Sequence, residues 1–361
     1  MKPIYVVGAT GYTGSLVVEA LRRRDVPLVA VARDERKLAD LEKRLGCKLE
    51  KRRADVTRPE DLVGLFEGAG AVINTVGPFA RYGEAVVEAA IEAGAHYVDT
   101  TGEQSFQRRV YERFHRAAIG KRIAVVTGHA FEFAISAFGA ALLHKRVGPV
   151  VGVSSYHRVR GFRPSRGTFA SALDMLGRDF VVYRDGNLVE PEIRFTPKQI
   201  RLPGEAEELS AIEVAGGDVV MLALDIQPLR MASCHVVFDG TAARFTALLS
   251  GLRGKTGPAP FSVLARYANT LRNGVREPTP SERQRVEWTV WVDALSESGA
   301  HVFRAQGRDV YGISAELVTL AAIWLAEGRG LDIGVLSSGR ALDPVASLDA
   351  LAEAGVSWDL R

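Results

Sequence analysis

The clearest chemical signal in the sequence is a glycine-rich segment close to the N-terminus, Gly8-Ala9-Thr10-Gly11-Tyr12-Thr13-Gly14. It lies between an expected strand at Ile4–Gly8 and an expected helix at Thr13–Arg24. Glycines in this context permit a tight turn and let the backbone approach a pyrophosphate, while the helix N-terminus supplies oriented N–H donors. A tight turn without a ligand is the alternative. The expected dinucleotide-binding residues here are Gly8, Thr10, Gly11, Tyr12, Thr13 and Gly14.

Arg33 stands at the end of the second expected strand, Leu28–Arg33. An NAD-selective site usually has a carboxylate at this place, which holds the ribose 2′-hydroxyl. A guanidinium can instead pair with a 2′-phosphate in fork geometry. Asp34, the next residue, is either a ribose ligand or the N-cap of a helix. We therefore expect NADP as the cofactor, with NAD as the less favoured alternative.

Two further strand ends carry polar and turn-forming residues. Asp55 follows the third expected strand, and Asn74-Thr75-Val76-Gly77-Pro78 follows the fourth. Open α/β sheets bind ligands at the carboxyl ends of their strands. Helix capping by Asp55 and turn formation by Asn74 and by Gly77-Pro78 are the alternatives. We expect the adenine and nicotinamide ends of the cofactor to be lined by Asp55, Asn74, Val76, Gly77 and Pro78.

A parallel sheet is needed to bring these strand ends together. Over residues 1–130, short β-branched runs alternate with helical patterns, which is typical of βαβ units and of a doubly wound α/β sheet. The expected strands are 4–8, 28–33, 49–55, 71–75, 97–100 and 123–127, and the expected helices are 13–24, 35–45, 59–66, 84–93 and 106–119.

After about residue 145 the pattern changes to a mixed α+β arrangement. Val150–Arg160 is strand-like, Thr168–Leu176 is helical, and Asp185-Gly186 is a hairpin turn signal. In Arg285–Leu295, apolar and polar residues alternate, which predicts a strand that faces a core on one side. Gly312–Ala326 predicts a long helix that returns to the nucleotide-binding domain, with a plain core helix as the alternative.

Composition and charge argue against several classes of protein. With 46 basic and 43 acidic residues and a formal charge of +3, the chain is not expected to bind nucleic acid. Cys47 and Cys234 are far apart and predict neither a disulfide nor a thiolate metal site. The seven histidines form no H-E-x-x-H pattern, so no metal is expected. No tyrosine precedes a lysine by four residues, as in common short-chain reductases, and no G-x-S-x-G elbow supports serine hydrolase chemistry.

Hydropathy and cysteine usage predict a cytoplasmic protein. The longest mostly apolar run, 130–143, contains Glu132 and is shorter than the ~20 residues that span a bilayer. Met1 leads almost directly into the first expected strand, which leaves no room for a signal peptide. We therefore expect no integral membrane segment and a reducing compartment.

Several sequence blocks together resemble the saccharopine dehydrogenase-like oxidoreductases. They are the glycine segment, Val72-Ile73-Asn74-Thr75-Val76-Gly77-Pro78-Phe79, Tyr82-Gly83-Glu84 and Val98-Asp99-Thr100-Thr101-Gly102-Glu103. Ser165-Arg166-Gly167-Thr168 and Asp309-Val310-Tyr311-Gly312 resemble later segments of the same family. The likeness covers most of the chain, thinly between residues 180 and 280, and is closer to the trans-acting enoyl reductases than to the saccharopine reductases.

The resemblance implies a domain organisation and an activity. It implies a Rossmann domain at 1–135, an inserted α+β substrate or dimerisation domain at 136–309, and a C-terminal helical segment at 310–361 that packs back on the first domain. It also implies hydride transfer from NADPH to a polarised C=C or C=N bond of a small-molecule or lipid-like substrate. A homodimer is compatible with this organisation. The alternative is a non-catalytic NADP(H)-binding sensor or scaffold.

One segment departs from the family pattern and contains the main catalytic candidate. Relatives have Gly-Phe-Asp-Ser-Ile-Pro-Ser-Asp after the sixth strand, where this chain has Ala130–Ala137, with Glu132 in the position of the family's Asp. Glu132 is expected to orient a substrate or relay a proton, with its pKa raised by partial burial beside Phe131 and Phe133. Helix capping by Glu132 is the alternative.

Three more residues complete the set of catalytic candidates. Ser165 and Thr168 lie at the start of an expected helix in the second domain, where N–H donors can bind a carboxylate or a thioester carbonyl. We expect them to face Glu132 across a cleft between the domains. Their alternative role is ordinary N-capping. Tyr82, from the block that follows the fourth strand, is the third.

Overall fold

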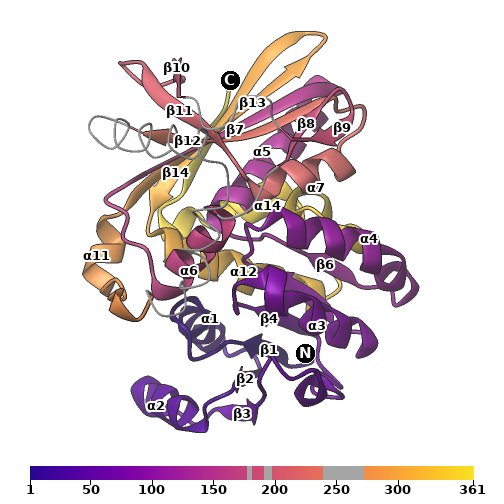
Figure 1. The fold of residues 1–361 in the computed structure, drawn as a ribbon, viewed down its shortest axis with the longest axis vertical. Helices are drawn as coiled ribbons and strands as arrows, with labels where there is room; N and C mark the ends of the chain where they lie inside the picture. The colour runs from indigo at the N-terminus through magenta and orange to yellow at the C-terminus, as the bar shows by residue number, and fades with distance from the viewer. Residues whose placement is uncertain (177–180, 191–196, 239–271) are drawn as a thin grey trace. The chain divides into compact units, whose positions relative to one another are not determined.

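The computed structural model describes residues 1–176, 181–190, 197–238 and 272–361 (Figure 1). The chain divides into two compact units, each built on its own sheet. Unit 1 consists of Met1–Phe131 and Tyr311–Asp343, and unit 2 of Glu132–Val310 and Pro344–Arg361. Each unit therefore takes one of its segments from the C-terminal part of the chain.

Within the described part of the chain, unit 1 contains a seven-stranded parallel sheet, sheet A, in the order β15-β6-β5-β4-β1-β2-β3. The six strands expected from the N-terminal sequence are present, and they have the strand order of a Rossmann fold. The predicted fold class is thus confirmed. The seventh strand, β15, comes from the C-terminal segment and was not expected. The strands are β1 Ile4–Val7, β2 Leu28–Ala32, β3 Glu50–Arg53, β4 Ala71–Asn74, β5 His96–Asp99, β6 Ala124–Val126 and β15 Gly334–Leu336.

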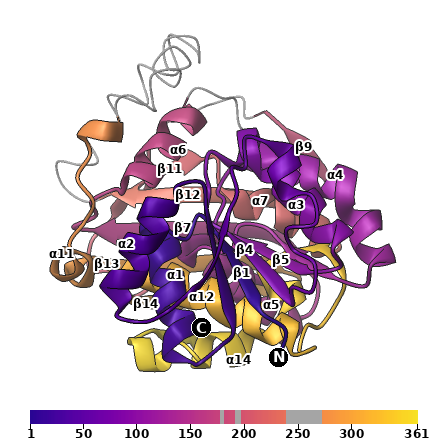
Figure 2. The same ribbon diagram turned by 90° about the horizontal axis from the view of Figure 1, so that it is seen from below.

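Helices cover both faces of sheet A. Figure 2 shows α3 and α4 together on one side of β1, β4 and β5, with α1 and α12 on the other. Glu316 of α12 forms ion pairs with Arg23 and Arg24 at the end of α1. The segment 59–66, which was expected to be a helix, contains only a short 3-10 helix. The helices are α1 Tyr12–Arg23, α2 Glu35–Leu45, η1 Pro59–Leu62, α3 Phe79–Glu92, α4 Gln104–Gly120, α12 Val310–Ala326 and α13 Ser338–Ala341.

Unit 2 is built on a mixed sheet, sheet B, in the order β10-β11-β12-β7-β13-β14-β16, with β8 joined to β12 and β9 to β8. β12 and β7 are parallel, and the other described pairs are antiparallel. Asp185-Gly186 joins β8 to β9, so the predicted hairpin is confirmed. The strands are β7 Val150–Arg160, β8 Val182–Arg184, β9 Asn187–Val189, β10 Lys198–Ile200, β11 Leu209–Val214, β12 Met231–Phe238, β13 Glu287–Ser296, β14 Gly299–Arg308 and β16 Ser357–Leu360.

Both faces of β13 are covered at its centre. Trp288, Val290 and Val292 are buried on one face, as the alternation predicts. The prediction that only one face meets a core is wrong, because Trp291 on the opposite face is also fully buried. Its partners form a second cluster on that face of sheet B, made of Leu202, Leu209, Ala211 and Val237.

The remaining helices of unit 2 include α5, which packs closely against sheet B. Gly139 of α5 allows this approach, because a Cβ at this position would lie 2.4 Å from the Phe303 ring of β14. At the C-terminus, β16 pairs with β14, so the segment after Pro344 clusters with unit 2 rather than with the nucleotide-binding sheet. Among the described residues, no helix is long and apolar enough to cross a membrane. The helices are α5 Phe131–Val147, α6 Arg166–Leu176, α7 Gly217–Asp225, η2 Arg272–Gly274, α11 Pro280–Arg285, α14 Pro344–Asp349 and η3 Ala352–Ala354.

Candidate functional site

The glycine loop after β1 holds α1 close to the end of sheet A. A Cβ at Gly14 would lie 2.1 Å from the carbonyl oxygen of Gly8, and one at Gly8 would lie 2.7 Å from Thr75 Oγ1. Gly8 also has a φ of +83°, which favours glycine. Gly11 is different, because it is exposed and its nearest neighbour, the Gly8 oxygen, is 3.1 Å from the position of a Cβ. Packing therefore requires Gly8 and Gly14, whereas Gly11 keeps the outer side of the loop open.

The N-terminus of α1 presents uncapped backbone amides. Gly11 is its N-cap residue and provides no side-chain hydrogen bond, and no acidic residue lies in the first turn. Thr10, Tyr12 and Thr13 are all partly exposed around this helix start. The ring of Tyr12 contacts that of Tyr311 edge-on, with the ring centroids 5.0 Å apart. Amides at such a helix end attract an anionic group such as a pyrophosphate.

Asp34 and Arg33 have different roles at the end of β2. Asp34 is the N-cap of α2, because its Oδ1 accepts hydrogen bonds from the backbone N–H groups of Arg36 and Lys37 at 3.0 and 3.2 Å. The capping alternative is thus what the geometry shows for Asp34. Arg33 is exposed, and its positive charge is one of several factors that lower the pKa of Asp55. A guanidinium, and not a carboxylate, is therefore the exposed group directly after β2.

Asp55 is part of a turn after β3. Its Oδ1 accepts hydrogen bonds from the backbone N–H and the hydroxyl of Thr57, at 3.0 and 2.8 Å. These bonds are the main reason why the pKa of Asp55 is below its ordinary value, and the charges of Arg33 and Arg58 act in the same direction. The carboxylate is thus positioned by its own turn at the carboxyl end of β3.

Asn74 shapes the loop that follows β4. Its side chain is fully buried, donates to the Tyr97 hydroxyl at 3.1 Å and accepts from the N–H of Val76 at 3.0 Å. Val76 and Gly77 are partly exposed, whereas Pro78 is buried as the N-cap residue of α3. The buried Asn74 side chain therefore fixes the conformation of the loop, and Val76 and Gly77 form the part of the loop that is exposed to solvent.

Glu103 has a structural role that the sequence did not predict. Its buried carboxylate accepts hydrogen bonds from the N–H groups of Phe79 and Ala80, both at 2.8 Å, and so caps the N-terminus of α3. Glu103 itself lies in the loop after β5. The carboxylate therefore connects the loops after β4 and β5. Its place in the Val98–Glu103 block, directly before the helix that begins at Gln104, is the sequence signal that could have identified it.

Asp99, at the end of β5, connects a third loop. Its Oδ1 accepts from the N–H groups of Thr101 and Gly128, both at 2.9 Å. Burial raises the pKa of Asp99 to about 7, although these amides and the Tyr97 hydroxyl lower it. The loops after β5 and β6 are thereby held together by a carboxyl group whose charged form is costly inside the protein.

Glu132, the second residue of α5, is partly exposed and lies next to a group of buried polar residues in unit 2. Burial, and then the charge of Asp218, raise its pKa to about 7, so the predicted direction of the shift is confirmed. Asp218 accepts a hydrogen bond from the Ser155 hydroxyl at 2.6 Å. Cys234 Sγ lies 3.6 Å from His157 Nδ1 in the same group. Sequence spacing did not suggest this arrangement, because its members are spread over about a hundred residues.

The other catalytic candidates lie in two different units. Ser165 Oγ accepts a hydrogen bond from the Thr168 N–H at 3.2 Å and lies 3.0 Å from the Thr168 hydroxyl, as expected for N-capping of α6. Tyr82 is partly exposed in α3, in unit 1. A shared catalytic role for these residues and Glu132 stays a prediction.

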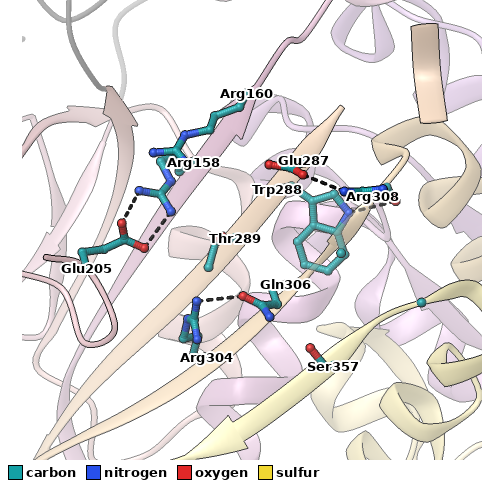
Figure 3. A pocket seen from close by; sticks show the side chains of 12 residues that line it. Arg158, Arg160, Glu205, Glu287, Trp288, Thr289, Arg304, Gln306, Arg308 and Ser357 are labelled. Carbon is teal, nitrogen blue, oxygen red and sulfur yellow. Dashed lines mark hydrogen bonds and ion pairs between the residues drawn. The ribbon is translucent and has the colours of Figure 1, made fainter. Parts of the chain in front are cut away.

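A polar pocket of about 460 Å³ lies on sheet B (Figure 3). Arg158 forms a fork-like pair with Glu205 at 2.6 and 2.7 Å, and Arg308 donates to Glu287 at 2.9 Å. The pocket offers guanidinium donors to an anionic group, but two of its arginines already have carboxylate partners. Its charged lining residues are Arg158, Arg160, Arg304, Arg308, Glu205 and Glu287.

Comparison with known proteins gives a family match for the N-terminal third of the chain. Residues 4–125 match the saccharopine dehydrogenase NADP binding domain. A Mycobacterium tuberculosis protein named after the trans-acting enoyl reductases is 27% identical over 406 residues, covering 98% of this chain and 96% of that protein. The bovine saccharopine dehydrogenase-like oxidoreductase is 28% identical over 196 residues, 48% of this chain and 46% of its own. The predicted resemblance to this oxidoreductase family is confirmed.

Two further comparisons concern fold and location. Saccharopine dehydrogenase (L-Glu forming) of Saccharomyces cerevisiae superposes with a TM-score of 0.62 over 100% of this chain and 99% of that one. The two are 12% identical, so this likeness concerns the fold alone. A Caenorhabditis elegans protein named for lipid droplet localisation is 31% identical over 39% of this chain and 36% of its own length. A cytoplasmic location stays a prediction.

Gly11→Val is expected to abolish NADPH binding while the protein stays folded. The new side chain occupies the open outer side of the loop, where a pyrophosphate would approach the α1 amides. Gly14→Ala is the contrasting variant, because its Cβ collides with the Gly8 carbonyl and should lower the melting temperature. Calorimetric titration with NADPH and thermal melting measure both effects. Normal NADPH affinity in Gly11→Val would mean that the loop is only a turn.

Asp99→Asn is expected to weaken the pH dependence of stability. The folded pKa of about 7 exceeds the ordinary 3.8, so the folded state binds more protons and the free energy of unfolding falls as pH rises between these values. The loss is roughly 2–4 kcal/mol for a shift of this size. Asparagine stays neutral and can still accept from Thr101 and Gly128. Denaturant unfolding at pH 5 and pH 8 measures the free energy of unfolding, and Asp40→Asn at an exposed position is the control. If this free energy changed with pH in Asp99→Asn as much as in the unmodified protein, the prediction would be contradicted.

Proposed function

We propose that this chain, whose residues 4–125 match the saccharopine dehydrogenase NADP binding domain, is an oxidoreductase that uses NADPH to reduce a polarised double bond. The observation that carries the proposal is the uncapped N-terminus of α1, which follows a loop whose Gly8 and Ala9 N–H groups donate to Val31, two residues before the exposed Arg33. A C=C bond conjugated to a carbonyl, as in an enoyl thioester, is the favoured substrate. A C=N bond is the alternative. Support for the enoyl class comes from the mycobacterial relative, which matches nearly the full length of the chain.

The residues of unit 1 suit NADP at each part of the cofactor. The α1 amides and the open side of Gly11 suit the pyrophosphate. Arg33 suits the ribose 2′-phosphate, since Asp34 is occupied as the cap of α2. Val76 and Gly77 form the exposed part of the loop expected at the nicotinamide end. When bound, the cofactor supplies a hydride, and the chain's own residues position the reactants and handle the proton.

Glu132 is the proposed proton donor. Addition of hydride to a conjugated C=C bond leaves negative charge that has to be quenched by a proton at the neighbouring carbon. Glu132 is partly exposed, and it is carried by α5, the first helix after β6. Its surroundings favour the protonated carboxyl, which is the form that can donate. Ser165 and Thr168, at the start of α6, are proposed to bind the substrate carbonyl or carboxylate, and Tyr82 to lie beside the nicotinamide.

A non-catalytic sensor of NADP(H) is the second candidate. It is favoured by the replacement of the family's Asp with Glu132 and by the hydrogen bond between the Ser165 and Thr168 hydroxyls, which uses one of their two O–H donors. Thermal shift with NADPH, followed by a screen of enoyl and imino acceptors, separates the two. Binding without turnover of any acceptor supports the sensor, whereas NADPH oxidation that depends on an enoyl thioester supports the reductase.

Arg33→Asp is expected to reduce the preference for NADPH over NADH by roughly 10- to 100-fold. This is the size of one lost charge-assisted hydrogen bond, to which repulsion between Asp and the 2′-phosphate adds. Dissociation constants for both cofactors measure the preference. Arg116→Asp makes the same charge change at an exposed position on α4 and should leave it unaltered. Equal affinities for NADPH and NADH in the unmodified protein would refute the assignment of Arg33.

Glu132→Gln is expected to lower kcat by about 100-fold or more while the NADPH dissociation constant stays the same. Glutamine keeps the size and most of the hydrogen bonding but cannot donate the proton, a contribution that is typically 10²- to 10⁴-fold. Glu132→Asp should recover part of the loss. Glu208→Gln, at an exposed position in unit 2, is the control. Steady-state kinetics with an active acceptor decide the matter, and an unchanged kcat in Glu132→Gln would exclude the role.

A further inference from the structure

Three side chains with the chemistry of metal ligands meet inside unit 2. They are His157 on β7, Asp218 in the first turn of α7 and Cys234 on β12. One potential ligand atom from each lies within 4.8 Å of the others, and all three residues are buried. The set combines an imidazole nitrogen, a carboxylate oxygen and a thiol sulfur. These are the donor types that zinc sites in proteins use.

The separation between the sulfur and the imidazole nitrogen fits a tetrahedral zinc ion. Zinc lies about 2.3 Å from a cysteine sulfur and about 2.0–2.1 Å from a histidine nitrogen, so at a tetrahedral angle these two atoms are about 3.6 Å apart. Cys234 Sγ and His157 Nδ1 are 3.6 Å apart. The two atoms therefore stand where a shared metal would place them.

Hydroxyl and amide groups around the cluster orient its members. Ser136 Oγ lies 2.8 Å from His157 Nε2, so Nε2–H can donate to it and leave the lone pair of Nδ1 directed at Cys234. Ser155 Oγ donates to Asp218 Oδ2 at 2.6 Å, and the Val219 N–H donates to Oδ1 at 3.0 Å. Each carboxylate oxygen keeps a second lone pair. Partners of this kind fix the tautomer and the orientation of metal ligands.

The local fold explains why these residues meet. β7 and β12 are parallel neighbours in a register that places Ser155 opposite Cys234, so Cys234 projects to the same face of sheet B as Ser155 and His157. α7 begins close to this face. Residue 216, just before α7, has to be glycine, because a Cβ there would lie 2.2 Å from Cys234 Sγ and 2.5 Å from Asp218 Oδ1.

In contrast to the expectation from sequence spacing that no metal is bound, we propose that unit 2 binds one Zn²⁺ ion through Cys234 Sγ, His157 Nδ1 and a carboxylate oxygen of Asp218. Zinc takes the place of the thiol proton, which is released to solvent, and no oxidation or reduction takes place. A water molecule completes the tetrahedron. A thiolate among three ligands selects zinc over magnesium or calcium, which bind oxygen donors. The ion ties α7 to the centre of sheet B, and its binding requires neither NADPH nor turnover.

Cobalt substitution of the tag-free, full-length protein tests the proposal directly. Metal-depleted protein titrated with Co²⁺ should show intense visible bands of tetrahedral cobalt and a near-ultraviolet thiolate charge-transfer band that saturates at one equivalent. Zn²⁺ should displace the cobalt and abolish both signals. Zinc content of the protein purified from zinc-supplemented cells should approach one ion per chain. Neither measurement involves NADPH or turnover, so failure here is distinguishable from failure of the proposed function.

Variants assign the ligands. Cys234→Ser should remove the charge-transfer band, and His157→Gln and Asp218→Asn should each weaken Zn²⁺ binding by at least about 10-fold. Cys47→Ser, at the partly exposed cysteine of unit 1, is the matched control and should keep the full spectrum. Circular dichroism shows whether each variant is folded.

Measurements on the unmodified protein can refute the proposal even if a variant does not fold. Absence of the charge-transfer band in unmodified protein at a several-fold excess of Co²⁺ would overturn it. So would a band that persists in folded Cys234→Ser or disappears in Cys47→Ser.

Discussion

α1 can approach the loop after β1 only because residue 14 has no side chain. A Cβ at Gly14 would lie 2.1 Å from the Gly8 carbonyl oxygen, which is far inside van der Waals contact. This contact directs the uncapped amides of α1 towards the carboxyl end of sheet A. The rest of the dinucleotide site depends on it, since Arg33 and the loop after β4 are useful to a cofactor only if the pyrophosphate is held between them.

Two buried carboxyl groups hold the neighbouring loops in place. Glu103 accepts from the two amides at the start of α3, and Asp99 accepts from the loops after β5 and β6. Backbone amides are suitable partners, because they offset part of the cost of taking a carboxylate out of water without adding a second charge. For Asp99 the offset is incomplete, and its pKa rises to about 7. The loops are thus held in place by hydrogen bonds to two buried carboxyl groups.

The two faces of sheet B in unit 2 carry different groups of polar residues. The face towards α5 and α7 carries the buried group around His157, Asp218 and Cys234. On β7, Arg158 lines the arginine-rich pocket, whereas the adjacent residue His157 belongs to the buried group. Adjacent residues of a strand point to opposite faces, so two such neighbours can serve different environments.

The sequence by itself determined six of the seven strands of sheet A and the position of the glycine loop, but it predicted a longer helix than the 3-10 helix at Pro59–Leu62. These features are local, because hydrophobic periodicity and glycine spacing act within one or two turns of chain. Arg33 was recognised for the same reason, since it directly follows its strand. The role of Asp34 as a cap was one of two local alternatives, and a hydrogen bond of 3.0 Å to Arg36 decided between them.

Only the tertiary structure decided the long-range features. β15 joins sheet A from residue 334 onward, and β16 joins sheet B through β14, which no local pattern specifies. Glu103 meets the start of α3 from 24 residues away. Cys234 lies 77 residues from His157 in the chain but 3.6 Å from it in space. Their meeting depends on the parallel register of β7 with β12 and on the glycine before α7, so it follows from packing rather than from spacing along the chain.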